Sequence, residues 1–268
     1  MNILITGGNG FLAKELAFYL QDFNITSITR QQVDLENIEE LQNFFKDKYF
    51  DLVLHCAVKG GHRTTLDESK IVHDNIRMFL NLSKFSDHYT YLINFGSGAE
   101  LDRRNDLFTK HYADKEIPED YYGFAKNIIA RLCMLKKNFY NFRIFNVFSE
   151  NEISSRMIRN SVSRYINKQS LIVHQDRYMD FMYSEDLSKI VRTFINKPFD
   201  KNEIDCVYDE KYKLTDVARI INHLSDYKVP VELCSSDLGN GYCGVYSNLG
   251  IEFIGLEKSI QKVYQKLL

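Results

Sequence analysis

The fold of this chain is decided by the stretch Asn2-Ile-Leu-Ile-Thr-Gly-Gly-Asn-Gly-Phe-Leu-Ala13. Its apolar run at residues 3–5 predicts a short buried strand of a parallel sheet. Three glycines at positions 7, 8 and 10 end that run, and the apolar spacing from Leu12 to Leu20 predicts a helix. A strand, a glycine turn and a helix in this order favour a site for a dinucleotide.

The glycines have a physical reason in such a site. Side chains at Gly7 and Gly10 would hold a pyrophosphate away from the main-chain amides at the helix N-terminus, where the helix dipole favours anions. An ordinary strand-to-helix turn is the alternative, because glycine is common in turns. We expect the cofactor to contact Gly7, Asn9, Gly10, Phe11 and Leu12.

The bulk composition limits the partners. The chain has 268 residues with a formal net charge of −2 and no concentrated basic stripe, which argues against nucleic acid as the main partner. No apolar run is long enough to span a membrane. We expect a cytoplasmic protein, because the five cysteines are scattered as reduced thiols would be and Met1 leads straight into a strand without a signal peptide.

Alternating strands and helices predict an α/β fold: a Rossmann-type doubly wound parallel sheet with a smaller C-terminal α/β region for the substrate. We place the NAD(P)-binding domain at residues 1–150 and the substrate-binding region, interleaved with the sheet, mainly at 151–268. Strands are expected at 25–29, 51–55, 91–95, 142–147, 171–174, 178–183 and 229–233. Helices are expected at 37–48, with Asn37 as cap, and at 67–85, 121–137, 153–167, 185–196, 215–224 and 257–268.

The end of the second strand bears on cofactor choice. An acidic residue there would bond the ribose hydroxyls of NAD, whereas Arg30 suits a 2′-phosphate and favours NADP(H) over NAD(H). A solvated surface arginine is the alternative. Cys56, Ala57 and Val58 follow the strand at 51–55, and their small side chains would let the chain pass beneath the ribose.

A tyrosine and a lysine four residues apart, Tyr122 and Lys126, share one face of a predicted helix. An ammonium near a phenol lowers the phenol's pKa from about 10, so that Tyr122 can give a proton to a carbonyl oxygen while hydride arrives at carbon. The lysine can also bond the nicotinamide ribose. Ser97 ends a predicted strand, where a hydroxyl faces the ligand.

These motifs resemble the extended short-chain dehydrogenase/reductase (NAD-dependent epimerase/dehydratase) family. Thr6-Gly7-Gly8-Asn9-Gly10-Phe11-Leu12-Ala13 is similar to its Thr-Gly-x-x-Gly-x-x-Gly signature, with alanine in the last place, and the order Ser97, Tyr122, Lys126 matches its catalytic triad. The resemblance implies that Asp34 and Leu35 lie beside the adenine, that Asn75 steadies the central strands, and that the chain forms a homodimer through helices 67–85 and 121–137.

Within that family the chain is most similar to the GDP-L-fucose synthase-like nucleotide-sugar reductases. Residues 57–61 resemble their Ala-Ala-Lys-Val-Gly-Gly run, and Arg143-Ile-Phe-Asn-Val-Phe148 resembles an Arg-x-x-Asn-x-Tyr run in which Asn146 lies near the substrate diphosphate. Met179 stands where the family has a diphosphate-binding arginine, so Arg177, two residues earlier and on the same face if this segment is a strand, is expected to replace it. A surface arginine is the alternative, and Arg156 is a further candidate. Lys59 is a further candidate for binding the substrate.

Two departures narrow the reaction. In epimerising members of the family a cysteine two residues after the serine serves as base for C3/C5 epimerisation, and here that residue is Ala99. In the dehydratases an Asp-Glu pair follows the serine or threonine directly, and here Gly98 and Ala99 stand in those places, with Glu100 one residue further along. We therefore expect an NADPH-dependent reductase of a nucleotide-diphospho-4-keto-6-deoxy sugar, in the biosynthesis of surface-polysaccharide sugars. The alternatives are a 4-epimerase that retains NAD and a non-catalytic cofactor-sensing protein. His55 is expected in the core, and no metal site is expected, because His62, His73, His88 and His111 lack ligand spacing.

Overall fold

A six-stranded sheet forms the centre of the first of two units in this computed structural model, which describes residues 1–61, 66–107 and 117–268. The first unit lies within residues 1–102, 112–144 and 194–205, and the second within 103–111, 145–193 and 206–268. The strands of the sheet are β1 (Asn2–Thr6), β2 (Asn24–Ile28), β3 (Phe50–His55), β4 (Tyr89–Ser97), β5 (Phe139–Ile144) and β9 (Glu203–Cys206).

The sheet has the order β2-β1-β3-β4-β5-β9, and the neighbours from β2 to β5 pair in parallel. Thr6 lies opposite His55, and Ser97 lies opposite Ile144, so the carboxyl ends of the strands meet at one edge. The helices of this unit are α1 (Phe11–Tyr19), α2 (Ile38–Phe45), α3 (Lys70–Ser83) and α4 (Tyr121–Met134), with short 3-10 turns η1 (Ser86–His88) and η2 (Gly98–Glu100). The predicted Rossmann-type fold is confirmed.

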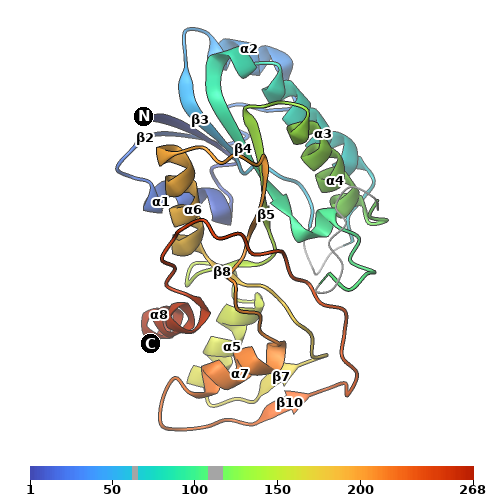
Figure 1. Ribbon diagram of the computed structural model, residues 1–268, viewed down its shortest axis with the longest axis vertical. Helices are drawn as coiled ribbons and strands as arrows, with labels where there is room; N and C mark the ends of the chain where they lie inside the picture. Colours follow the sequence, from blue (N-terminus) through green and yellow to red (C-terminus); the bar gives the residue numbers. More distant parts are fainter. Residues whose placement is uncertain (62–65, 108–116) are drawn as a thin grey trace. The chain divides into compact units, whose positions relative to one another are not determined.

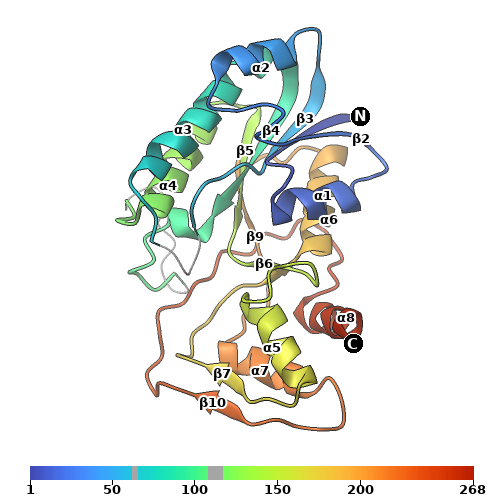
Figure 2. The same cartoon turned by 180° about the vertical axis from the view of Figure 1, so that it is seen from behind.

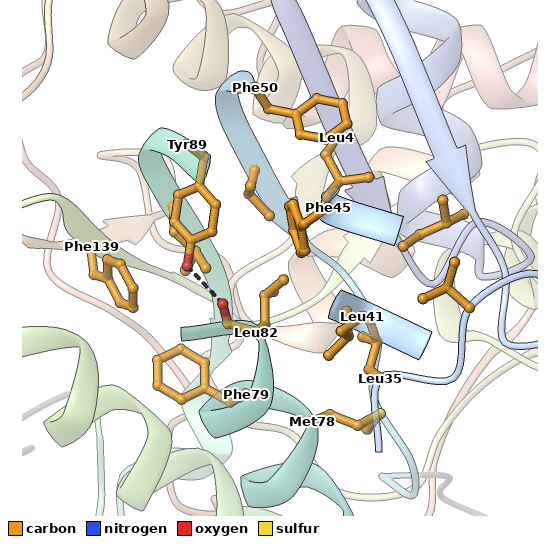
Figure 3. Packing of buried hydrophobic residues seen from close by; sticks show 14 of the residues in the cluster. Leu4, Leu35, Leu41, Phe45, Phe50, Met78, Phe79, Leu82, Tyr89 and Phe139 are labelled. Atoms are coloured by element: carbon orange, nitrogen blue, oxygen red, sulfur yellow. Dashed lines mark hydrogen bonds between the residues drawn. The ribbon is translucent and has the colours of Figure 1, made fainter. Parts of the chain in front are cut away.

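Helices α2, α3 and α4 lie along one face of the sheet and α1 lies on the other (Figures 1 and 2). The apolar residues of the central strands β1 and β3 are buried, as Leu4 and Val53 show. Figure 3 shows how Phe45 of α2 and Leu82 of α3 pack with Tyr89 of β4, whose hydroxyl donates to the carbonyl oxygen of Leu82 at 3.0 Å. This core packs α2 and α3 onto the sheet.

The second unit contains smaller elements. Its strands are β6 (Val147–Phe148), β7 (Leu171–Val173), β8 (Met182–Tyr183) and β10 (Val231–Leu233), which form two parallel pairs, β6 with β8 and β7 with β10. The remaining helices are α5 (Met157–Ile166), α6 (Ser184–Asn196), α7 (Leu214–Asn222) and α8 (Leu256–Leu267). Among the described residues, no helix is long and apolar enough to cross a membrane.

Two predicted strands have the wrong bounds, one strand of the sheet was not predicted, and the helix expected at 153–167 begins only at Met157. The strand expected at 142–147 runs from Phe139 to Ile144, and Val147 instead pairs with Met182. The strand expected at 178–183 is reduced to Met182–Tyr183, preceded by isolated bridges at Tyr178 and Met179. Strand β9 has no counterpart in the prediction, because only its alternate residues Ile204 and Cys206 are buried and the others are acidic.

Candidate active site

The glycine turn between β1 and α1 requires glycine at position 7. Gly7 has a φ of +71°, and a Cβ built there would lie 2.8 Å from the main-chain nitrogen and Cα of Ala57. The turn is closed by main-chain hydrogen bonds from Gly8 to the Ile28 carbonyl and from Gly10 to the Gly7 carbonyl, both at 2.8 Å. The main chain after β3 therefore lies so close to the glycine turn that position 7 has no room for a side chain.

The N-terminus of α1 is open to an anion. Gly10 is the N-cap residue, no side chain caps the helix, and its first turn holds no acidic residue. The N–H groups of a helix's first turn have no acceptor within the helix, and the dipole makes this end positive. Asn9 is exposed beside them, with its amide 3.5 Å from Gln31. The Gly7–Leu12 turn thus fits the diphosphate of a dinucleotide, whose charge it would offset.

Arg30 lies just past β2 with two-thirds of its side chain exposed, so its guanidinium is accessible. It forms ion pairs with Asp34 at 3.4 Å and with Glu36 at 3.5 Å. The Asp34 carboxylate also accepts from the Glu36 amide at 3.0 Å. Leu35 is buried in the core, so its side chain is committed to packing and only its main chain is left for a cofactor.

The segment that leaves β3 lies against the glycine turn. The Ala57 amide donates to the Thr6 hydroxyl at 3.3 Å, and that hydroxyl is 2.9 Å from Nδ1 of His55. Burial, helped by the charge of Lys126, lowers the pKa of His55 to about 3. His55 is therefore a neutral core residue, as the sequence predicted. Burial also raises the pKa of the Cys56 thiol, while Val58 is exposed.

Lys59 is held inside the first unit. Its ammonium forms ion pairs with Asp74 at 2.7 Å and with Glu36. Burial lowers the pKa of Lys59, but the hydrogen bonds to Asp74 and Glu36 outweigh burial and raise it. Asn75 fixes the main chain of Lys59 with two hydrogen bonds, accepting from its N–H at 2.8 Å and donating to its carbonyl at 2.9 Å. The lysine predicted to bind substrate thus has its charge satisfied by two carboxylates.

Ser97 is the last residue of β4 and the N-cap of η2. Its hydroxyl oxygen accepts from the Ala99 amide at 3.1 Å, which leaves the hydroxyl proton to be donated elsewhere. The side chain is 7% exposed. The serine is thus held by its own turn at the carboxyl edge of the sheet, where ligands of parallel sheets bind.

Tyr122 and Lys126 share the first turns of α4, which Asp120 caps by accepting from the Gly123 amide at 2.7 Å. The Lys126 ammonium lies 6.0 Å from the centre of the Tyr122 ring and donates to the Phe95 carbonyl at 2.7 Å. Burial lowers the pKa of Lys126 to about 8, against the opposing charge of Glu100.

Two close contacts bring Tyr122 to the other site residues. A Cβ at Gly123 would lie 2.5 Å from the Ala99 carbonyl, so the start of α4 packs directly on the Ser97 turn. A Cβ at Gly61 would lie 2.8 Å from the Tyr122 ring, so the segment that follows β3 reaches this tyrosine. The first unit therefore brings together the glycine turn, Cys56 to Lys59, Ser97, Tyr122 and Lys126.

The two remaining candidates, Asn146 and Arg177, belong to the second unit. Asn146 is buried, and its amide donates to the Asp180 carbonyl at 2.9 Å. Arg177 donates from Nη2 to Gln175 at 2.7 Å. The expectation that Arg177 shares a strand face with Met179 fails, because strand β8 begins only at Met182.

Sequence analysis assigned Glu100 and Arg143 no role in the catalytic group, yet they form a buried ion pair of 2.5 Å, and the carboxylate accepts from the Ser97 amide. The signal was present: a carboxylate and a guanidinium inside otherwise apolar segments need partners. Among the described residues, no group of three histidine, cysteine or acidic side chains could hold a metal ion. His62 and His111 lie outside the described residues.

The parallel sheet, the glycine turn and the open helix N-terminus define a dinucleotide-binding protein of the Rossmann class. Residues 3–207 match the model of the NAD dependent epimerase/dehydratase family, and the chain belongs to that family. The expected membership and the expected NAD(P)-dependent enzyme class are confirmed by this match.

Relatives and solved structures agree with this assignment. Protein CapI of Staphylococcus aureus is 23% identical, with 76% of this chain and 72% of that protein covered. GDP-L-colitose synthase of Yersinia pseudotuberculosis is also 23% identical, with 85% and 83% covered. The GDP-mannoheptose C4 reductase of Campylobacter jejuni, solved with NADP bound, has a TM-score of 0.83 at 19% identity, covering 98% of this chain and 97% of that one. At that identity the structural likeness shows the fold.

Proposed function

We propose that this chain is an NADPH-dependent reductase of a nucleotide-diphospho-4-keto-6-deoxy sugar. The observation that carries the proposal is the joint placement of Ser97, Tyr122 and Lys126 in one unit with the glycine turn. Relatives named GDP-L-colitose synthase and GDP-L-fucose synthase support the nucleotide-sugar class. The fold neighbour solved with NADP, a GDP-mannoheptose C4 reductase, supports reduction at C4.

A bound NADPH supplies hydride to the carbonyl carbon. In the proposed reaction, Tyr122 donates its phenolic proton to the carbonyl oxygen, which becomes the product hydroxyl. The Ser97 hydroxyl donates a hydrogen bond to the same oxygen, since its own oxygen already accepts from Ala99. The positive charge of Lys126, 6.0 Å from the ring centre, favours the phenolate that Tyr122 leaves behind.

Reduction without epimerisation or dehydration is supported by two residues of the turn that follows Ser97, Ala99 and Glu100. Ala99 is buried and carries no group that could move a proton. Glu100 is fully buried and held by Arg143, so it is not placed to take a proton from a sugar carbon. Hydride transfer with one proton donor is the chemistry that the remaining residues support.

Cofactor and substrate contacts complete the proposal. Gly7 to Leu12 would hold the diphosphate of the cofactor, and Arg30 would bind the 2′-phosphate that distinguishes NADPH from NADH. Asp34 would lie beside the adenosine. We assign the diphosphate of the substrate to Asn146 and Arg177 of the second unit. Exposed apolar side chains on α3 and α4, Leu80 and Met134, are consistent with a homodimer through these helices.

The test is a panel of nucleotide-diphospho-4-keto-6-deoxy sugars, heptose forms included, each mixed with NADPH while its absorbance is followed. Stoichiometric loss of NADPH absorbance with one sugar, together with a new C4 hydroxyl in the product, supports the reductase. A purified protein that keeps NAD bound and interconverts C4 alcohols without net oxidation of NADPH is the 4-epimerase, and contradicts the proposal. Tight NADPH binding with no turnover of any nucleotide sugar also contradicts it.

A further inference from the structure

Glu100 is a buried carboxylate that the proposed reaction does not use. It has no exposed surface, and each contact that its side chain makes comes from a donor. The Ser97 amide donates to Oε2 at 3.1 Å, and Asn141 and Arg143 donate to Oε1 at 2.8 and 2.5 Å. Burial raises the pKa of Glu100, with Arg143 opposing. These donors oppose the effect of burial and favour the ionised form of the carboxyl.

The same strand end that holds Glu100 also holds Lys126. A Cβ at Gly96 would lie 2.6 Å from Oε2 of Glu100, so the carboxylate rests directly on the main chain of β4. One residue earlier, the Phe95 carbonyl accepts from the Lys126 ammonium at 2.7 Å. Asn127, next to Lys126 on α4, donates to the main-chain carbonyl of Glu100 at 2.8 Å. The carboxylate and the ammonium are thus fixed to three consecutive residues of one strand.

The charge of Glu100 is only partly offset by Arg143. The guanidinium also binds Asp205 at 2.5 Å and Glu203, so one cation serves three carboxylates. An incompletely neutralised carboxylate in a buried region acts on a neighbouring cation more strongly than it would in water.

Three other described titratable groups that interact with the charge of Lys126 are neutral. His55 is neutral because burial and the lysine charge lower its pKa to about 3. The thiols of Cys56 and Cys133 are neutral because burial raises their pKa values. Of the described groups whose charge acts on Lys126, Glu100 is therefore the ionised one, and it opposes the effect of burial on the lysine.

We propose that Glu100 is a positioning residue of the site, which keeps Lys126 protonated at neutral pH and holds the Ser97 turn at the end of β4. It touches neither the sugar nor the cofactor and acts through these two residues. Its importance for catalysis rests on the proposed function, whereas its electrostatic coupling to Lys126 is independent of that function. The coupling between Glu100 and Lys126 can therefore be disproved while the proposed reductase function stands, and the reverse.

The coupling is measured by NMR on the full chain labelled with ¹³C at lysine Cε. The signal of Lys126 is assigned by its disappearance in Lys126→Met and followed against pH in wild type and in Glu100→Gln. We expect the pKa of Lys126 to fall by about one unit or more in Glu100→Gln, the lower end of what one opposite charge confers. Glu39→Gln, which removes an exposed carboxylate on α2, should leave the Lys126 signal unchanged.

A second measurement covers the case in which Glu100→Gln does not fold. Coupling between two sites is reciprocal, so removing the lysine charge must shift the carboxylate by the same amount in the opposite sense. In protein labelled with ¹³C at glutamate Cδ, the pKa of Glu100 should rise by about one unit or more in Lys126→Met. A shift below 0.2 unit (roughly 0.3 kcal/mol) in either experiment would overturn the proposal.

Discussion

Replacing Lys126 by methionine should make the stability of the chain depend differently on pH. The lysine is 6% exposed, and burial lowers its pKa from 10.5 to about 8. Below pH 8 the lysine is protonated in both the folded and the unfolded chain, so folding must desolvate the charge. Between pH 8 and 10.5 the folded chain releases the proton first, and the penalty is relieved as pH rises.

The size of the effect follows from the two pKa values. At pH 7 the buried charge destabilises the folded chain by about 3 kcal/mol, and at pH 10 by about 1 kcal/mol. From pH 7 to pH 10, the free energy of unfolding of wild type should therefore rise by about 2.5 kcal/mol relative to that of Lys126→Met. The difference at pH 7 alone is less informative, because the variant also leaves the Phe95 carbonyl without its donor, at a cost of about 1–3 kcal/mol.

Urea unfolding followed by circular dichroism at pH 7, 8, 9 and 10 gives the free energies for both proteins. Groups that titrate alike in both proteins do not contribute to the difference between their free energies of unfolding. Lys14 is exposed on α1, and Lys14→Met is the matched control for the loss of a lysine from the surface. If the free energies of unfolding of wild type and Lys126→Met differ by the same amount at every pH from 7 to 10, Lys126 is not a buried charge in the folded chain.

Three further changes test other parts of the structure. Arg30→Ala should weaken NADPH binding about tenfold or more and NADH binding less than twofold, measured by cofactor fluorescence, because only NADPH carries the 2′-phosphate; equal losses would rule out that contact. Gly7→Ala should lower the free energy of unfolding by more than the about 1–2 kcal/mol that a left-handed backbone costs an alanine, because its Cβ would also meet Ala57. Gly250 also has a positive φ but has open space around it, so Gly250→Ala is the control that should lose only the backbone strain. Asn37→Ala should lower the free energy of unfolding by about 1 kcal/mol, because the asparagine accepts from the amides of Glu39 and Glu40.

Local chemistry made the first unit predictable. The apolar run at residues 3–5, the glycines and the Asn37 cap each depend on neighbouring residues, and each appears as expected. Tyr122 and Lys126 share a helix face because four residues make about one turn. His55 is neutral and buried at the end of β3, again as its place in an apolar strand indicated.

Contacts between residues far apart in the sequence account for the features that sequence analysis missed. Strand β9 depends on Arg143, far away in sequence, whose guanidinium binds Glu203 and Asp205; without that partner the acidic residues predict a loop. The same arginine explains Glu100, which was considered only as a displaced dehydratase residue. Lys59 was expected to bind substrate because it resembles a family motif, and its ion pairs with Glu36 and Asp74 could not be foreseen from spacing.

The central claim is that Tyr122 gives the proton while a dinucleotide rests on the Gly7–Leu12 turn. Tyr122→Phe removes one hydroxyl and keeps the ring that packs on Gly61. With the sugar that the panel identifies, turnover in Tyr122→Phe should fall by about 100-fold or more, while the dissociation constant for NADPH changes less than about threefold, under 1 kcal/mol. Unchanged turnover, or a parallel loss of turnover and NADPH binding, would contradict the assigned role.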